Sequence, residues 1–307
     1  MSTILMTHTA CFDHVTPPGH PEQVARLDAV LGALKGLGLR EMTAPMAAED
    51  DILRAHPKSH IEAIRAAAPD SGWRSLDADT HMSVGTLEAA FRCAGGAVRA
   101  VDAVMSGEAG NAFVAMRPPG HHAERETAMG FCFFGTVAIG AKHALDHHGL
   151  ERVAIVDFDV HHGNGTQDLV EDDPRILFCS THQSPLYPGT GAAHETGVGN
   201  VVNCPLPDGA GSKAFRDVMD TVVLPRVDAF SPQLLLISAG FDAHKDDPLA
   251  GMNLVEDDFA WITDRLCDLA DTHCKGRVVS SLEGGYDLPA LGASAAAHVS
   301  VLKERAS

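Results

Sequence analysis

The order of apolar segments in this sequence predicts an α/β fold with a mostly parallel central sheet and helices on both faces. Short apolar runs such as 153–156 and 234–239 alternate with segments of helical periodicity between residues 111 and 304. Runs that are apolar throughout indicate strands that are buried on both faces. No linker, repeat or low-complexity tract interrupts the 307 residues, so we expect a single domain over 1–307.

The composition narrows the possible functions. A formal net charge of −18 argues against nucleic-acid binding, because phosphate recognition needs a cationic surface. No stretch approaches the roughly 18 apolar residues that span a bilayer, and the N-terminus lacks the basic start of a signal peptide. Seven cysteines without a Cys-x-x-Cys pair argue against a disulfide framework and a thiolate zinc site. We expect a cytoplasmic protein that binds neither nucleic acid nor membrane, in an oligomeric state that the sequence leaves open.

The N-terminal part alternates less regularly than the rest. Apolar residues from Val24 to Leu34 keep helical spacing, and Gly36 and Gly38 end that helix. Gly95-Gly96, inside an alanine-rich helix, allows close packing of a neighbour. The expected elements are a strand at 2–8, a surface loop at 11–20, a helix from Pro21, a strand at 39–43, short helices between 48 and 67, a loop at 69–83 and a helix at 85–106.

From residue 111 the alternation of strands and helices is regular. Strands are expected at 112–116, 153–157, 175–180, 201–204, 234–239 and 277–282, and helices at 133–148, 212–229 with an interruption near Pro225, 255–272 and 287–304. His147-His148 lies at the end of one helix, before Gly149, where basic residues interact favourably with the helix terminus. We interpret that histidine pair as ordinary helix-end chemistry.

Polar clusters follow five of these strands. They are Arg117-Pro-Pro-Gly-His121-His122, Asp157 to Asn164, Ser180-Thr181-His182, Gly240-Phe-Asp242-Ala-His244 and Glu283-Gly-Gly-Tyr286. In open α/β sheets, ligands bind outside the carboxyl ends of the strands. We therefore expect clusters from distant parts of the sequence to meet at one edge of the sheet.

Three residues of these clusters are candidate metal ligands. Asp159 and His161 are two positions apart, so on an extended segment both side chains point the same way. Asp242 would supply a third ligand, and mixed oxygen and nitrogen donors favour zinc. Three protein ligands leave a fourth position open, as in a catalytic zinc site. Taken alone, the Asp-x-His pair is equally compatible with a hydrogen-bonded turn.

Hydrolysis of an amide also needs a base, an acid and a donor to the developing oxyanion. His121 and His122 can supply the proton chemistry if Asp157 or Asn164 orients their second ring nitrogens. Tyr286, in a glycine-rich turn, can supply a phenolic donor.

These residues stand in motifs that resemble the zinc-dependent histone deacetylase and acetylpolyamine amidohydrolase family, most closely its class II branch. The motifs are Arg117-Pro-Pro-Gly-His-His-Ala123, Gly130-Phe-Cys-Phe-Phe134, Asp157-Phe-Asp-Val-His-His-Gly-Asn-Gly-Thr166, Tyr187-Pro-Gly-Thr-Gly191, Ile237-Ser-Ala-Gly-Phe-Asp-Ala-His244 and Glu283-Gly-Gly-Tyr286. His20-Pro-Glu22 with Arg26 also resembles the family's N-terminal helix. The resemblance spans almost the whole chain and implies a single-domain arginase/deacetylase-like fold.

The resemblance implies a role for each matching residue. It implies one zinc ion on Asp159, His161 and Asp242 and a structural potassium ion on Asp157, Asp159 and Ser180. His122 would be the main base and acid, with His121 as its electrostatic partner and Tyr286 as the donor to the oxyanion; Asp157 would face His121, and Asn164 would face His122. The implied substrate tunnel is lined by Phe131, Tyr187, Leu249 and Gly284. The implied substrate is an acylated amine, such as an acetyl-lysine peptide, an acetylpolyamine or a small metabolite. The sequence does not decide between these substrates, or between Zn²⁺ and Fe²⁺.

Two functions of other classes remain alternatives. A manganese ureohydrolase of the arginase type shares the fold in outline, but it holds two metals with additional carboxylates at these strand ends. A non-catalytic acyl-lysine binding module would be expected to have lost a ligand, a histidine or Tyr286, and this sequence retains them all.

Overall fold

The computed structural model describes residues 2–306 and confirms the α/β prediction. Eight strands form one sheet in the order β2-β1-β5-β10-β9-β6-β7-β8, and all neighbouring strands in it are parallel. These strands are β1 (Thr3–Thr7), β2 (Arg40–Thr43), β5 (Asn111–Val114), β6 (Val153–Asp157), β7 (Ile176–Gln183), β8 (Val201–Leu206), β9 (Leu234–Ala239) and β10 (Val278–Leu282).

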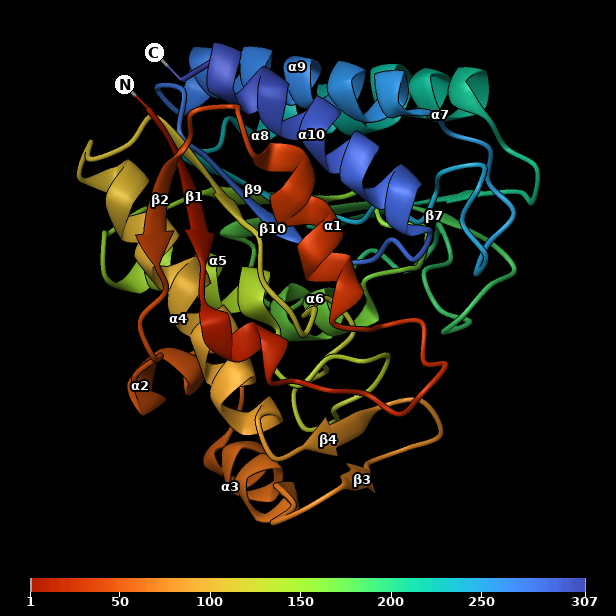
Figure 1. The fold of residues 1–307 in the computed structure, drawn as a ribbon. Coiled ribbons are helices and arrows are strands. Elements are labelled where there is room, and N and C mark those ends of the chain that lie inside the picture. The colour runs from red at the N-terminus through yellow and green to blue at the C-terminus, as the bar shows by residue number, and fades with distance from the viewer. Residues whose placement is uncertain (1, 307) are drawn as a thin grey trace.

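Helices cover both faces of the sheet (Figure 1). On one face, α10 (Leu288–Glu304) packs between α1 (Ala25–Leu34) and α9 (Glu256–His273), and the other face carries α4 (Thr86–Met105) against α5 (Thr136–Asp146). The remaining helices are η1 (Thr9–Phe12), α2 (Glu49–Ile52), α3 (Lys58–Ala67), α6 (Asn164–Val170), α7 (Ser212–Val218), the π-helical turn η2 (Met219–Val223) and α8 (Leu224–Phe230).

The central strands form the core. All residues of β5, β6, β9 and β10 are buried, because helices pack on both sides of them. Each valine or isoleucine buried in this way contributes about 1.5–3 kcal/mol to folding. All seven cysteines are unpaired and buried. Within residues 2–306, no helix combines the length and the apolar character needed to cross a bilayer.

Two segments predicted as loops contain regular structure. The predicted surface loop at 11–20 begins within the short helix η1, and His14 in it is only 1% exposed. The predicted loop at 69–83 contains a hairpin of β3 (Trp73–Ser75) and β4 (His81–Ser83). The loop prediction at 11–20 is therefore wrong only in its first two residues and in its position at the surface, whereas the prediction at 69–83 missed the hairpin. Tertiary contacts order both segments, and the short polar strands carry no hydrophobic periodicity.

Two further differences concern helices. Helix α6 was missed because it begins at Asn164, within the polar cluster that we assigned wholly to a loop. The predicted interruption near Pro225 is confirmed as the π-helical turn η2, which precedes α8. Proline has no N–H to donate to the preceding turn, so the α-helical ladder cannot continue unchanged through it.

Gly95, in α4, allows the chain segment that follows β2 to cross the helix at close range. A Cβ atom on Gly95 would lie 2.2 Å from the backbone oxygen of Pro45 and 2.6 Å from the backbone nitrogen of Ala47. Ala47 N also donates a hydrogen bond to Phe91 O of α4 at 3.1 Å. The close packing expected at Gly95 is therefore present, and its partner is backbone that cannot move aside cheaply.

We expect Gly95→Ala to lower the free energy of unfolding by about 1–3 kcal/mol, because the cost of overpacking exceeds the gain in helix propensity. Gly32→Ala in α1 is the matched control, since no atom lies within 4 Å of its added Cβ, and it should be stabilising by up to about 1 kcal/mol. Urea denaturation of both variants measures the difference. Equal stability of the two variants would contradict the role given to the contact with Pro45.

Candidate active site and metal centre

The five polar clusters meet at the carboxyl edge of the sheet. Strands β5, β10, β9, β6 and β7 are consecutive neighbours, so the residues that follow them emerge side by side. The direction of winding also reverses among these strands: the chain passes from β6 to β7 to β8 and then returns to β9 and β10. Ligand sites of α/β sheets form at such a reversal.

The three candidate metal ligands converge. His161 Nδ1 lies 3.1 Å from Asp159 Oδ1 and 3.2 Å from Asp242 Oδ2. One donor atom from each residue lies within 4.8 Å of the other two, and both carboxylates are almost completely buried. Two carboxylates and an imidazole that face one point form a donor set suited to a divalent transition metal such as zinc.

Two glycines make room for these carboxylates. A Cβ atom on Gly240 would lie 2.0 Å from Asp159 Oδ2, and one on Gly284 would lie 2.1 Å from Asp242 Oδ2. Gly284 N also donates to Asp159 Oδ2 at 2.8 Å, and Val160 N donates to Asp242 Oδ1 at 2.8 Å. His161 N donates to the other oxygen of Asp159 at 2.9 Å, so backbone amides hold both oxygens of Asp159 and one oxygen of Asp242.

The charges around the three ligands attract positive charge. Burial opposes ionisation of Asp159, but the neighbouring His121 and His161 hold its pKa well below the usual range. Burial and the negative charge of Asp159 raise the pKa of Asp242. Burial lowers the pKa of His161, yet its hydrogen bonds to Asp159 and Asp242 outweigh burial and raise it to about 10. A cation between these groups would relieve the repulsion of the two carboxylates, so the residues present fit the metal that the donor set indicates.

The two histidines of the Arg117 cluster have different partners. His121 Nδ1 lies 3.0 Å from Asp157 Oδ2, and His122 Nδ1 lies 2.7 Å from Asn164 Oδ1. Asn164 Nδ2 donates to Glu124 Oε1 at 2.8 Å, which leaves the amide oxygen to accept from His122. That arrangement protonates Nδ1 of His122 and leaves Nε2 as its basic atom.

Because of these partners, the two rings differ in charge. Burial acts to lower the pKa of His121, but Asp159 and Asp157 outweigh it and raise the pKa well above the usual range. Burial and the nearby His121 and His161 lower the pKa of His122 well below the usual range. These surroundings therefore favour a charged ring at His121 and a neutral ring at His122.

A pocket of about 250 Å³ leads to these groups. It is lined by Pro21, Asp79, His122, Gly130, Phe131, His161, Leu186, Tyr187, Leu249 and Tyr286. Three of the four residues that we expected in the tunnel, Phe131, Tyr187 and Leu249, are thus in its wall. Gly284 is not among the lining residues, and it lies against the metal-site carboxylates instead.

The pocket wall depends on an unusual backbone at Gly130 and Phe131. Phe131 has φ of 69° and Gly130 has φ of 54°. Residues other than glycine rarely adopt this left-handed backbone conformation. A Cβ atom on Gly130 would lie 2.4 Å from Cδ2 of His122. Phe131 N donates to Thr80 Oγ1 at 3.2 Å, and the Phe131 ring packs edge-on against His20. These contacts hold the aromatic ring in the wall beside His122.

Tyr286 is positioned from two sides. Its backbone N donates to Asp247 Oδ2 at 2.7 Å, and the guanidinium of Arg26 stacks over its ring at 4.8 Å. Burial raises the pKa of the Tyr286 phenol well above the usual range, although Arg26 opposes this shift. The phenol therefore remains protonated and can donate a hydrogen bond into the pocket.

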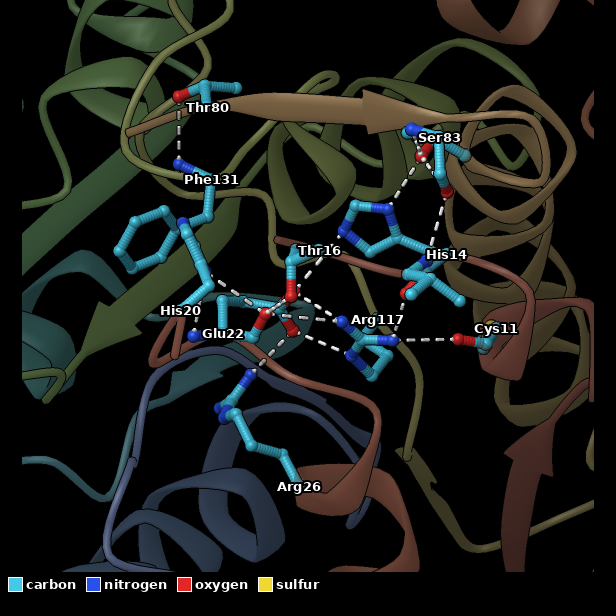
Figure 2. A network of polar contacts seen from close by, with 12 residues as sticks. Cys11, His14, Thr16, His20, Glu22, Arg26, Thr80, Ser83, Arg117 and Phe131 are labelled. Atoms are coloured by element: carbon cyan, nitrogen blue, oxygen red, sulfur yellow. Dashed lines mark hydrogen bonds and ion pairs between the residues drawn. The ribbon is translucent and has the colours of Figure 1, made fainter. Parts of the chain in front are cut away.

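A buried charge network centred on Glu22 ties the N-terminal segment to two of the site loops (Figure 2). Arg117 donates to both oxygens of Glu22 and to the backbone oxygens of Cys11 and His14. Arg26 donates to Glu22 Oε1 at 3.1 Å.

Arg26 continues this network to the loop that carries Tyr286. Its Nε donates to the backbone oxygen of Gly285 at 2.6 Å, and its Nη2 donates to that of Glu283. The side chain of Glu283 in turn accepts from the backbone N of Gly120 at 2.7 Å and of His121 at 3.2 Å. Glu22, Arg26 and Glu283 thus act as positioning residues for the histidine pair and Tyr286.

Sequence reasoning assigned no roles to several of these groups. Glu22, Arg26 and Arg117 lay within quoted motifs, but their convergence depends on contacts between distant segments that periodicity does not reveal. Asp79 and Leu186 of the pocket wall carried no signal at all, since they lie in loops. Apart from that resemblance, Glu22 and Arg26 stood out only as a charged pair spaced i,i+4 beside an apolar helix, and such pairs are usually solvated.

The residues expected to bind potassium also come together in part. Asp157 and Ser180 are paired across β6 and β7, and Asp157 Oδ1 accepts from Asp159 N at 3.0 Å. Ser180 Oγ lies 2.9 Å from His182 Nδ1. These contacts place the three residues close together, and the potassium ion itself stays a prediction.

Comparisons with known proteins agree with this geometry. The sequence profile of the histone deacetylase domain matches residues 20–302. The histone deacetylase-like amidohydrolase of Pseudomonas aeruginosa is 42% identical over 89% of this chain and 74% of its own length. A probable deacetylase of Archaeoglobus fulgidus is 40% identical over 94% of this chain and 82% of its own length. The crystal structure of the HDA15 HD domain superimposes with a TM-score of 0.94 at 34% identity, covering 99% of this chain and 89% of that one.

We expect Glu22→Gln to lower the free energy of unfolding by about 3–5 kcal/mol, because it leaves the buried guanidinium of Arg117 without its counter-charge. Asp217→Asn is the control, since Asp217 pairs with Lys213 on the surface and its loss should cost less than about 1 kcal/mol. Chemical denaturation followed by circular dichroism measures both values. A similar small loss in both variants would show that Glu22 is not needed to balance the buried charges.

Proposed function

Since the chain belongs to the histone deacetylase family, we propose that it is a zinc-dependent deacetylase that hydrolyses the amide of an acylated amine. The convergence of Asp159, His161 and Asp242 beside His122 and Tyr286, at a pocket of about 250 Å³, carries this proposal. The substrate class comprises acyl-lysine peptides and related acylated amines.

Each residue has a role that follows from its surroundings. Asp159, His161 and Asp242 would hold the metal, which when bound supplies a Lewis acid that activates water and polarises the substrate carbonyl. His122, neutral and oriented by Asn164, takes the proton from the attacking water and returns it to the leaving amine. His121, paired with Asp157, contributes positive charge beside it. Tyr286 donates a hydrogen bond to the carbonyl oxygen as negative charge develops there.

Further features belong to this proposal. Residues 1–307 act as one catalytic domain, since strands from both ends of the sequence belong to one sheet and α1 packs against α10. Potassium binds Asp157, Asp159 and Ser180 as a structural ion, supported by the pairing of Asp157 with Ser180. The protein is cytoplasmic and acts without nucleic acid or membrane.

Acetylpolyamines and small acylated metabolites form the second candidate substrate class. Asp79 in the pocket wall favours such cationic molecules, because a carboxylate there attracts a second amine. Leu249, also in the wall, stands where polyamine-selective relatives can carry a carboxylate, and it favours an apolar contact instead. Asp79 and Leu249 thus have opposite effects on the preference for a cationic substrate, so the two substrate classes must be compared directly.

Two other classes of function fit the site less well. A binuclear manganese ureohydrolase would need further carboxylates facing a second ion, whereas the histidine pair and Tyr286 occupy the surroundings of Asp159 and Asp242. A binding module without catalysis would not need a neutral, oriented imidazole at His122. The retained donor set and proton-transfer groups therefore favour hydrolysis.

We expect chelation to abolish amide hydrolysis and Zn²⁺ to restore it, because water activation depends on the metal. The assay is a kinetic panel of an acetyl-lysine peptide, acetylputrescine, acetylspermidine and longer acyl-lysines. In Asp242→Ala, which removes one ligand, Zn²⁺ should not restore the activity, and elemental analysis should find less bound zinc than in the wild type. Turnover that survives chelation, or a zinc content in Asp242→Ala equal to that of the wild type, would refute the metal-dependent mechanism.

We expect Tyr286→Phe to lower kcat by about two to three orders of magnitude while the fold and bound metal remain, the usual cost of losing one oxyanion donor. Tyr187→Phe is the comparison, since it removes the chain's other phenol from the pocket wall, and it should alter KM more than kcat. Steady-state kinetics on the best substrate of the panel distinguish the two. Near-normal kcat in Tyr286→Phe would remove the phenol from the mechanism.

A further inference from the structure

A second group of metal-binding side chains lies between α4 and α5, apart from the pocket. Asp102, in the last turns of α4, faces His143 of α5 and the residues His147 and His148 that follow α5. Both helices end shortly before a strand of the sheet begins, β5 after α4 and β6 after α5. This group, which we call the α4/α5 histidine cluster, therefore lies away from the carboxyl edge that carries the candidate active site.

The four side chains of the cluster converge. Asp102 Oδ1 lies 2.7 Å from His143 Nε2 and 2.8 Å from His148 Nε2. The ring of His147 stacks on that of His143 with centroids 4.8 Å apart, and it lies 4.9 Å from that of His148. One donor atom from each of the four residues lies within 4.8 Å of all the others. Small side-chain rotations would bring all four atoms to the distance of about 2 Å at which zinc is held.

His143 provides an independent sign of a ligand. It is 4% exposed, and its Nδ1 is buried with no hydrogen-bond partner. That nitrogen faces Asp51 Oδ1 of α2 at 3.8 Å, while Nε2 on the other side of the ring points into the cluster. Histidines that bind metals commonly donate their second ring N–H to a carboxylate. The second ring nitrogen of His143 faces the Asp51 carboxylate, although 3.8 Å is too long for a hydrogen bond between them.

The donor set selects the type of metal. Three imidazoles and one carboxylate suit Zn²⁺ and similar transition metals, whereas Mg²⁺ and Ca²⁺ require mainly oxygen. His143 and His147 are spaced i,i+4 around one helical turn, so both can reach one ion. Burial opposes ionisation of Asp102, but hydrogen bonds from His143 and His148 lower its pKa to about 2, so the carboxylate is ionised and able to bind.

We propose that Asp102, His143, His147 and His148 form a second, structural binding site for a divalent transition metal that joins α4 to α5. Four protein ligands would enclose the ion, which distinguishes this site from the open three-ligand site at the pocket. Asp51 positions His143 and does not touch the ion. The ordinary helix-end role expected for His147-His148 is thereby replaced by metal binding.

Zinc binding to the full-length protein tests this proposal without an activity measurement. The protein is stripped of metal by chelation and dialysed against buffered free Zn²⁺ in the micromolar range, and bound zinc is counted by elemental analysis. We expect about two equivalents in the wild type and about one in His147→Gln/His148→Gln. Both replaced side chains are at least partly exposed, so the variant should fold. His194→Gln, at an exposed histidine outside both sites, should retain about two equivalents.

A second variant separates this site from the one at the pocket. Asp242→Ala should retain about one equivalent, held by the α4/α5 histidine cluster, and Zn²⁺ should still raise its Tm. That rise should disappear when His147→Gln/His148→Gln is added. Unchanged zinc content in His147→Gln/His148→Gln relative to wild type, or a wild type whose only zinc is lost in Asp242→Ala, would overturn the proposal. If Asp242→Ala leaves the zinc content unchanged but His147→Gln/His148→Gln lowers it, the proposed metal at the pocket is refuted and the metal at the α4/α5 histidine cluster is supported.

Discussion

The site depends on cations and hydrogen-bond donors that offset the negative charge of five carboxylates buried close together. Glu22, Asp157, Asp159, Asp242 and Glu283 are each at most 1% exposed. Burying an unpaired charge is costly, so each carboxylate must have a partner. Glu22 has two guanidiniums, Asp157 has His121, Asp159 and Asp242 share His161, and Glu283 accepts from two backbone amides. Glu283 has no cation of its own, and burial raises its pKa to about 7. Two carboxylates that share one imidazole, at the candidate metal site, and Glu283 are thus the parts of this layer whose negative charge is not fully matched.

The buried charge network that stabilises the fold also positions the groups proposed for catalysis. Arg26 connects Glu22 to the backbone of Glu283 and Gly285, so the segment before α1 fixes the turn that carries Tyr286. Glu283 fixes the backbone of Gly120 and His121. The catalytic groups emerge from different strands, and their mutual geometry is set by side chains that do not face the pocket. Damage to these positioning groups would lower activity even though every proposed catalytic residue remained.

The sequence predicted the strands and the strand-end clusters because both carry local signals. Mostly apolar runs marked β6 and β9, and Asp159 and His161 stood two positions apart shortly after one of them. It failed where structure depends on distant contacts, as at the β3–β4 hairpin, whose residues are mostly polar. The α4/α5 histidine cluster shows the same limit. Asp102 lies about forty positions before His143, and only the packing of α4 against α5 brings it to the histidines. In the sequence alone, the adjacent pair His147-His148 therefore indicated only a helix end.

The candidate metal ligands and the loop residues of the pocket wall are held in place in different ways. The candidate metal ligands are held at strand ends by backbone amides, whereas Asp79, Leu186, Tyr187 and Leu249 lie in loops. Loops tolerate substitution better than buried strand ends do, because their side chains pack against fewer neighbours. In the proposed deacetylase, a change of substrate would require change only in these four loop residues, while the candidate ligands and proton-transfer groups stay fixed. The choice of acylated amine would then follow from the loop residues, and the proposed hydrolysis from the groups that follow the strand ends.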